Sequence, residues 1–364
     1  MSAPVEAFPD RLARLRSDLL RNGLDAALVT HRPNVRYLSG FTGSSGMLVV
    51  LGEETWLLTD FRYEEQASQE VGEAVEVVLA RDGLPATLEK RLGGRLEVRK
   101  VGFEAEHVTV RDRRELGERC GSVVWEDLPP TVERLRAVKE PSELERIESA
   151  VRIAEQAFED LLSVIREGMS ERDLAAELDY RLALRGSDGA PFDTIALSGE
   201  RTALPHGQPS TRRLCEGDLL LLDFGATRDG YCSDITRTVA LGRARPWQRQ
   251  VHAQVLGAQS AALEAIRPDR PAADVDRAAR EHLEAAGLGD RFGHSVGHGI
   301  GLEVHEGPRL YRASKETLAA GNVVTVEPGV YLPGRGGVRI EEDVAVAADG
   351  ARILTTSGSA LREL

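Results

Sequence analysis

Two aspartates in the segment 218–241 have a spacing that suits the binding of a cation. Asp229 and Gly230 are typical of a two-residue turn between two β-rich runs, which predicts a β-hairpin. Because side chains alternate between the faces of a strand, we expect Asp223 and Asp234 on one face as diagonal neighbours, about 7 Å apart at the backbone. The leucines before Asp223 indicate a strand buried on both faces, where an unpaired carboxylate is costly. This favours a shared metal ion over the alternative of two solvated strand residues.

Three of the eight histidines lie within residues 294–306. Each histidine alone is more often structural than a ligand, but their clustering makes at least one of them a candidate ligand. Glycines interrupt the segment, which disfavours a helix and predicts an extended stretch packed closely against other backbone. The histidines are His294, His298 and His305, and the glycines are Gly293, Gly297, Gly299 and Gly301.

Residues 293–297 also match Gly-x-Ser-x-Gly, the pattern around the nucleophile of many serine hydrolases. That fold requires an acid and then a histidine well downstream of the serine. The last histidine of this chain, His305, follows too soon after Ser295. A serine-hydrolase site is therefore not expected.

Two glutamates complete a group of four candidate carboxylates. Glu327 ends a β-rich run before a Pro-Gly turn, and Glu341 follows Arg339 within a strand predicted to begin in residues 337–343. Four carboxylates packed together carry a charge of about −4 and repel one another unless cations neutralise them. Oxygen-rich ligation without thiolates is typical of a two-metal hydrolytic site, in which ions about 3.5–4 Å apart share a nucleophilic water. Such donors favour manganese, with cobalt or zinc as competent substitutes.

The elements that must position these residues follow an N-terminal α/β pattern. Leucine spacing predicts a helix over 9–23, and short apolar runs predict the strands. Pro129 and Pro130 end the pattern, so we predict an N-terminal domain over 1–130 and a motif-bearing domain over 131–364. The strands are expected at 26–30, 46–52, 56–60, 75–80 and 98–104.

The second domain is predicted to contain two helices followed by strands, twice over. Ser142 with Glu145, and Ser170 with Asp173, are capping-box pairs that begin the first two helices. This order indicates a duplicated α+β unit, although no sequence repeat accompanies it. The later helices are expected near 247–266 and 272–286, and the strands at 215–241 and 322–347.

Composition narrows the class of protein. The chain has 364 residues, a formal net charge of −13 and 41% hydrophobic residues, so it can build sizeable cores. The acidity argues against a nucleic-acid partner, and no apolar run approaches the length of a membrane span. No signal peptide is recognisable, and three scattered cysteines form no disulfide framework. We therefore expect a reduced, cytoplasmic protein without nucleic-acid or membrane partners.

The chain resembles the pita-bread metallopeptidases, a family that includes methionine aminopeptidase, prolidase and aminopeptidase P. The resemblance covers essentially the whole chain and rests on DFGATRDGYCSDITRT, GHGIGLEVHEGP, TVEPG and GVRIEED, with ALPHG and RAVKEPSELERIESA upstream. It implies an α/β N-terminal domain and an α+β pita-bread catalytic domain of the creatinase/aminopeptidase kind, with a pseudo-twofold duplicated unit.

By position, the resemblance implies a site for two divalent metal ions per subunit, in which Asp234 and Glu341 bridge both ions. It places His206 against the substrate, His305 against the scissile group, and His294 in the same pocket of the proline-specific members. The implied metal ligands are Asp223, Asp234, His298, Glu327 and Glu341.

The N-terminal domain separates the branches of the family. Methionine aminopeptidases generally lack an α/β domain of this size, whereas prolidases and aminopeptidases P have one that residues 34–44 and 59–67 resemble. Creatinase-like hydrolases do not use the metal site, and relatives that act as peptide-binding modules lose ligands. Because all implied ligands are present, the resemblance implies a metallo-exopeptidase that cleaves the bond before a proline.

The mechanism implied is attack by a metal-bridging hydroxide on the carbonyl that precedes the proline nitrogen. Glu327 would shuttle the proton to the leaving nitrogen, and His305 and His294 would stabilise the oxyanion or hold the proline. His206 would contact the substrate next to the scissile bond. Arg339 would hold a bridging carboxylate in place, unless it is a surface arginine.

The length of the substrate is the open question. The form of the histidine motifs favours an Xaa-Pro aminopeptidase, and the alternative is an Xaa-Pro dipeptidase (prolidase). A dipeptidase must grip the free carboxylate after proline, for which Arg309 and Arg312 are candidates. The resemblance also implies proline-containing peptides as substrates and a homodimer.

Overall fold

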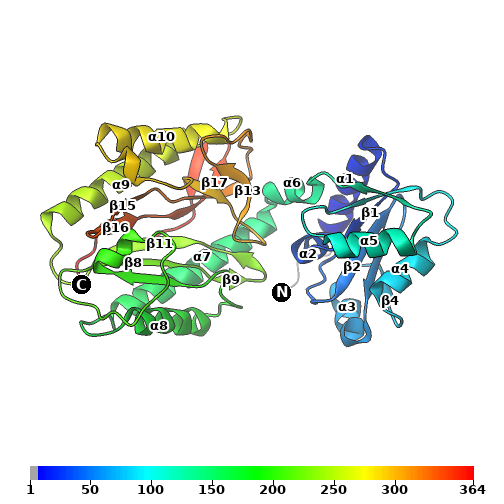
Figure 1. Cartoon of the computed structure of the whole chain (residues 1–364), viewed down its shortest axis with the longest axis horizontal. Coiled ribbons are helices and arrows are strands. Elements are labelled where there is room, and N and C mark those ends of the chain that lie inside the picture. Colours follow the sequence, from blue (N-terminus) through cyan, green and yellow to red (C-terminus); the bar gives the residue numbers. More distant parts are fainter. Residues whose placement is uncertain (1–6) are drawn as a thin grey trace. The chain divides into compact units, whose positions relative to one another are not determined.

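The computed structural model describes residues 7–364. Its contacts divide the chain into two compact units, Met1–Arg136 and Ala137–Leu364 (Figure 1). The predicted boundary at Pro130 lies just before helix α6 (Thr131–Ala137), most of which groups with the first unit. Within the described part of the chain, no helix is long and apolar enough to cross a membrane.

The N-terminal unit is built on a six-stranded sheet with the order β4-β3-β2-β1-β5-β6. Strand β1 pairs antiparallel with β2 and parallel with β5, and β5 pairs parallel with β6. All the strands expected in this part are present, as is the first helix. The strands are β1 (Ala26–Val29), β2 (Gly46–Leu51), β3 (Thr55–Thr59), β4 (Glu76–Leu79), β5 (Lys100–Phe103) and β6 (Val124–Asp127), and the helices α1 (Ala7–Arg21), α2 (Arg32–Ser39), α3 (Glu64–Glu70), α4 (Leu84–Leu92) and α5 (Val110–Arg119).

Helices α2, α3, α4 and α5 and strand β6 of this unit were not located from the sequence. Helix α2 is too short to show a clear apolar period, but it has a proline in its first turn and ends at Gly40, whose φ is 82°. These are ordinary start and stop signals. Strand β6 is four residues long and ends in two acidic residues, so its pattern is weak.

The second unit follows the predicted order of two helices and then strands, twice. The first half contains α7 (Pro141–Leu162), α8 (Glu171–Leu184) and the sheet β11-β8-β7, and the second contains α9 (Pro246–Ala265), α10 (Ala272–Ala285) and the sheet β13-β12-β14-β17-β18. The strands are β7 (Ile195–Ser198), β8 (Leu219–Phe224), β9 (Thr227–Arg228), β10 (Tyr231–Cys232), β11 (Ile235–Ala240), β12 (Gly297–Gly299), β13 (Glu306–Leu310), β14 (Val323–Val326), β15 (Gly329–Leu332), β16 (Gly336–Arg339), β17 (Glu342–Ala347) and β18 (Gly350–Ile353).

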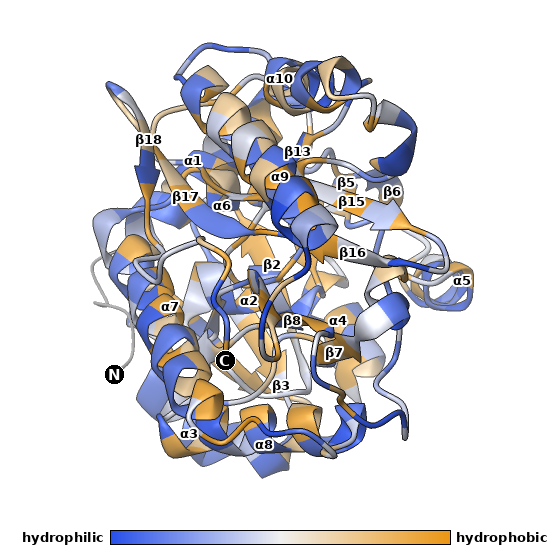
Figure 2. Ribbon diagram, turned by 90° about the vertical axis from the view of Figure 1, so that its left-hand side faces the viewer, coloured by the Kyte–Doolittle hydropathy of each residue, from blue (hydrophilic) through white to orange (hydrophobic). Residues whose placement is uncertain are grey.

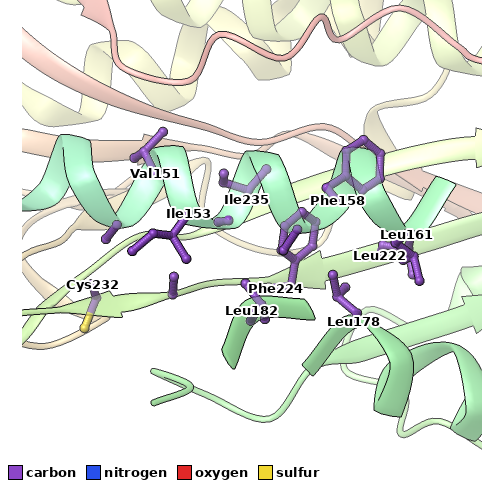
Figure 3. Close-up of a cluster of buried hydrophobic side chains, with 14 of the residues drawn as sticks. Val151, Ile153, Phe158, Leu161, Leu178, Leu182, Leu222, Phe224, Cys232 and Ile235 are labelled. Carbon is purple, nitrogen blue, oxygen red and sulfur yellow. The ribbon is translucent and has the colours of Figure 1, made fainter. Parts of the chain in front are cut away.

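Each half buries its own helix pair against strands. Figure 2 shows hydrophobic and hydrophilic residues side by side along α7, α8 and α9, as amphipathic helices on a sheet require. In Figure 3, Phe158 of α7 lies beside Phe224 of β8, with ring centroids 5.6 Å apart. A second hydrophobic cluster packs α9 and α10 mainly against the strands of the second half. These two cores hold the site-bearing strands in place.

The start of α7 differs from the prediction. The helix begins at Pro141, with Glu140 as its N-cap, and the backbone N–H of Glu140 donates to Oε2 of Glu143 at 2.9 Å. Ser142 therefore lies inside the first turn and is not the cap. Proline lacks an N–H and favours the first helical position, which shifts the cap to the preceding residue. The Ser170 cap of α8 is confirmed.

Candidate active site

The aspartate hairpin has the predicted register. Asp223 pairs with Thr236 across β8 and β11, and the turn residues Asp229 and Gly230 have positive φ angles of 47° and 76°. The same register continues past the strand ends, because the N–H of Ser233 donates to the carbonyl of Ala226 at 2.9 Å. No bulge interrupts the pairing, so both aspartates lie on one face, as expected.

The histidine segment is extended and closely packed, as predicted. Strand β12 lies between β13 and β14, and a Cβ at Gly297 would come within 2.0 Å of the carbonyl oxygen of Thr325. A Cβ at Gly299 would come within 2.1 Å of the carbonyl oxygen of Gly307. The two glycines therefore let neighbouring backbone approach on both sides of His298.

His298 faces the carboxylates in a form that can bind a metal. Its Nδ1 donates to the carbonyl of Gly299 at 3.0 Å, so its Nε2 keeps a lone pair. That nitrogen lies 3.7 Å from Oδ2 of Asp234 and 3.5 Å from Oε1 of Glu327. Burial lowers the pKa of His298 to about 4, which leaves the ring neutral. Donor atoms of Asp234, His298 and Glu341 all lie within 4.8 Å of one another.

Asp223 lies at the edge of this group and is held by Arg339. Its Oδ2 accepts a hydrogen bond from the Arg339 guanidinium, whereas its Oδ1 is buried with no hydrogen-bond partner in the described part of the chain. A buried carboxylate oxygen of this kind needs a cation or a donor. Asp223 lines the same cavity as the other implied ligands.

Arg339 contacts Asp223, whereas we expected it to hold one of the bridging carboxylates, Asp234 or Glu341. It binds Asp223 directly and reaches Glu341 only through Thr236, to which its Nε donates at 3.1 Å. The Thr236 hydroxyl donates to Oε2 of Glu341 at 2.6 Å. Strand β16 ends at Arg339 and β17 begins at Glu342, so Glu341 lies in the break between the two strands, whereas we expected it within a strand.

Without cations, the clustered carboxyl groups are costly to ionise. Burial, and next the neighbouring carboxylates, raise the pKa values of Asp234 and Glu341 well above their ordinary range. Burial also raises the pKa of Glu327 to about 8. Divalent cations would stabilise the charged forms, and the ligand set of four carboxylates and one neutral imidazole fits two such ions.

A cavity of about 730 Å³ opens onto these residues. The implied ligands, Arg339 and the three other predicted histidines all line it, as does Arg309. Arg312 is not among the lining residues; its side chain is 68% exposed and lies 3.5 Å from Glu284. Further lining residues are Phe192, Asp193, Ile195, Pro205, Gln208, Ser295, Gly297, Val304 and Tyr311.

Tyr331 is a site residue that the sequence interpretation missed. Its hydroxyl accepts from Arg339 and donates to Nε2 of His294, both at 2.8 Å. Burial raises the pKa of Tyr331 to about 12 and lowers that of His294 to about 4, so both groups are neutral at pH 7. Tyr331 lies in an apolar strand, and nothing in that pattern distinguishes it from a core residue.

Helix α10 also holds the segment that carries His294. Arg280 donates to the carbonyls of Phe292 and His294 and pairs with the buried Asp276. Asp276 accepts in turn from the backbone N–H of Val296 at 3.1 Å. The pair lies on one face of the helix, four residues apart, and was also not recognised from the sequence.

Comparison with known proteins identifies the families of both units. Residues 145–348 match the model of metallopeptidase family M24, and residues 11–138 match the creatinase/prolidase N-terminal domain. The chain is 39% identical over 347 residues to an uncharacterized peptidase, YqhT, of Bacillus subtilis, covering 95% of this chain and 98% of that one.

Two solved structures are similar over nearly their whole length. The Xaa-Pro dipeptidase from Bacillus anthracis superposes with a TM-score of 0.94 at 38% identity, covering 98% of this chain and 99% of that one. The X-Pro aminopeptidase from Thermotoga maritima gives a TM-score of 0.89 at 38% identity, covering 96% of this chain and 100% of that one.

The chain therefore belongs to metallopeptidase family M24, and its second unit has the pita-bread fold. It is a metallo-exopeptidase of the branch that carries a creatinase/prolidase N-terminal domain.

Proposed function

We propose that this enzyme hydrolyses the bond between an N-terminal residue and a following proline, and that its preferred substrates are Xaa-Pro dipeptides. Cleavage before proline is supported by two relatives of equal identity, one named an Xaa-Pro dipeptidase and the other an X-Pro aminopeptidase. The preference for dipeptides rests on one observation, the presence of Arg309 in the cavity that holds the carboxylate cluster.

Two divalent ions held by Asp223, Asp234, His298, Glu327 and Glu341 would activate water and polarise the scissile carbonyl. Manganese is the favoured ion because the donors are mostly oxygen, and cobalt or zinc would also fit. The neutral His298 supplies the nitrogen donor, since a protonated ring could not bind a cation.

Glu327 is the proposed proton shuttle. It lies in the cavity with its Oε1 3.5 Å from Nε2 of His298, where its carboxylate could take up the proton of the attacking water. The proton would pass to the proline nitrogen as the bond breaks. Before that, as the water attacks, His305 would donate to the developing oxyanion, because its ring lies at the cavity wall, 4.3 Å between centroids from His298.

The other two histidines bind substrate in this proposal. Both ring nitrogens of His294 are engaged, by the Ser295 carbonyl at 2.8 Å and by the Tyr331 hydroxyl. We therefore assign His294 a packing contact with the proline ring in place of oxyanion stabilisation. His206 is exposed at the cavity wall and would contact the residue before the scissile bond.

Arg309 would bind the free carboxylate of a dipeptide. Burial lowers the pKa of His305, and the guanidinium of Arg309 lowers it further; for the pKa of His298 the guanidinium contributes after burial and His305, which puts its charge near the reacting end of the cavity. A guanidinium pairs with a carboxylate through two parallel hydrogen bonds. A tripeptide has an amide at that position, so it would lose the charge-assisted contact.

The test compares Ala-Pro with Ala-Pro-Ala at one manganese concentration. We expect Ala-Pro to be the better substrate, and Arg309→Ala to lower kcat/KM for Ala-Pro by roughly 10- to 100-fold, the equivalent of one charged hydrogen bond. The same change should affect Ala-Pro-Ala much less. Arg312→Ala is the matched control and should leave both rates unchanged.

The second candidate is an Xaa-Pro aminopeptidase, which the similarity to the X-Pro aminopeptidase from Thermotoga maritima favours. This candidate predicts faster cleavage of Ala-Pro-Ala than of Ala-Pro, and no substrate-dependent effect of Arg309→Ala. The homodimer and the cytoplasmic location stay predictions. Sedimentation velocity and cell fractionation would test them.

A further inference from the structure

Two histidines and a glutamate of the N-terminal unit form another group of potential metal ligands. Donor atoms of His31, His107 and Glu133 lie within 4.8 Å of one another. None of these residues belongs to the carboxylate site. We propose that this group, the His-His-Glu cluster, binds one divalent transition-metal ion per chain, with zinc as the best fit.

The cluster lies where α/β sheets commonly bind ligands. β1, β5 and β6 are parallel neighbours, and the ligands follow their carboxyl ends: His31 comes shortly after β1, His107 after β5, and Glu133 lies in α6 beyond β6. The carboxyl edge of parallel strands is the usual place for ligand sites, because loops from several strands converge there.

A network of hydrogen bonds among buried polar residues holds parts of the His-His-Glu cluster in place. Asn34, which is fully buried, donates to Oε1 of Glu133 at 2.6 Å and to Oε1 of Glu104 at 2.7 Å. Oε2 of Glu104 accepts from the backbone N–H of His31 at 2.7 Å. Arg136 donates to Oδ1 of Asn34 at 2.7 Å. This network fixes the carboxylate of Glu133 and the backbone of His31, as the outer hydrogen bonds of metal sites do.

The donors also match the chemistry of zinc. Two imidazoles and one carboxylate occur together in zinc sites that keep a fourth position open, whereas the oxygen-rich active site favours manganese. The side chains of His107 and Glu133 are 29% and 34% exposed, so an ion can reach them from solvent.

Ion binding requires a small side-chain movement. The two rings are stacked, 3.5 Å apart and within 6° of parallel, and Nε2 of His107 lies 3.9 Å from Oε1 of Glu133. Parallel rings cannot aim their in-plane lone pairs at one ion between them, so one ring must tilt. His107 is the more exposed of the two and is the ring that would move.

The test counts zinc ions bound to the full-length chain by equilibrium dialysis followed by elemental analysis. The wild type should bind one Zn²⁺ per chain more than His107→Ala, and one more than Glu133→Gln. Both variants should keep the manganese-dependent peptidase activity, since neither residue lies in the catalytic unit. His282→Ala, a histidine outside both clusters, should bind as much zinc as the wild type.

A complementary pair of variants removes the contribution of the active site. Asp234→Ala/Glu341→Ala should still bind one Zn²⁺ per chain, and adding His107→Ala should abolish it. Equal zinc counts for the wild type and a folded His107→Ala would overturn the proposal and leave a stacked histidine pair only. Because the readout is a difference in bound zinc, it does not depend on which peptides the enzyme cleaves.

Discussion

Arg339 connects more of the active site than any single ligand does. Its guanidinium contacts Asp223, Thr236 and Tyr331, and through the latter two it reaches Glu341 and His294. Arg339 is 3% exposed, so its charge is compensated mainly by Asp223 when no ion is bound. The arginine therefore sets together the positions of Asp223, a proposed metal ligand, and of the His294 ring, which we propose binds substrate.

Removing this arginine should destabilise the protein. Arg339→Met leaves the carboxylate of Asp223 buried without its cation, and breaking a buried pair in this way typically costs about 3–5 kcal/mol. Urea unfolding of the chelated protein would measure the loss. The double variant Asp223→Asn/Arg339→Met should recover part of it, since no uncompensated charge remains. A double variant as unstable as the sum of the two single variants would show that the pair does not interact.

Some site residues could be predicted from the sequence and others could not, for physical reasons. The hairpin register followed from Asp229 and Gly230, because the turn type determines the pairing. Glu327 and Glu341 were candidates from the sequence, but a glutamate near a strand end has only a weak local signal, so their role as ligands came from the family resemblance. Tyr331 was missed because the hydroxyl of a tyrosine in an apolar strand finds its partners only through long-range packing.

At the scale of elements, β12 positions His298 by allowing backbone contact on both sides. The contacts at Gly297 and Gly299 are to backbone carbonyls of Thr325 and Gly307, which cannot move aside as a flexible side chain can. The glycine spacing indicated an extended segment, but it could not identify the strands that pack against it. Those strands come from residues that follow in the chain and are brought back by the fold.

Gly297→Ala should disrupt both the strand and the site. The new methyl group would meet the Thr325 carbonyl at 2.0 Å, so β12 must shift away from β14 and carry His298 with it. We expect a fall in kcat of at least about tenfold and a loss of stability of roughly 1–3 kcal/mol, as for overpacking in a core. Activity assays and thermal unfolding would measure the two effects.

Gly293→Ala provides the control within the same motif. Its added Cβ meets no atom within 4 Å, so stability should stay near that of the wild type. Equal losses for the two substitutions would argue that close packing at β12 is unimportant.

At the scale of the whole molecule, the metal site couples charge to stability. The chain carries a formal charge of −13, and four of its carboxylates are concentrated around one cavity. Burial holds the pKa of Glu327 near 8 against an ordinary value of 4.5, so the ion-free folded state binds this proton more tightly than the unfolded state. Binding of this proton stabilises the ion-free folded state fully below about pH 4.5, and the stabilisation is lost as the pH rises through 8.

Manganese should therefore stabilise the protein more at pH 8 than at pH 6. At the higher pH fewer protons compete with Mn²⁺ for the carboxylates, and the ion-free protein is less stable. Differential scanning calorimetry with EDTA or with Mn²⁺ at both pH values would measure the gain in Tm. Glu327→Gln should reduce the dependence of that gain on pH. A gain that is equal or larger at pH 6 would contradict this account.

The central claim is that the carboxylate cluster holds the metal ions that hydrolyse the bond before proline. The most direct measurement is the turnover of Ala-Pro by chelated wild-type enzyme and chelated Asp234→Ala, each before and after Mn²⁺ is added, with the metal content of both determined. We predict that activity returns to the wild type with Mn²⁺ and that Asp234→Ala stays inactive with less bound metal. Turnover by Asp234→Ala at the wild-type rate, or undiminished turnover by the metal-free wild type, would contradict the claim.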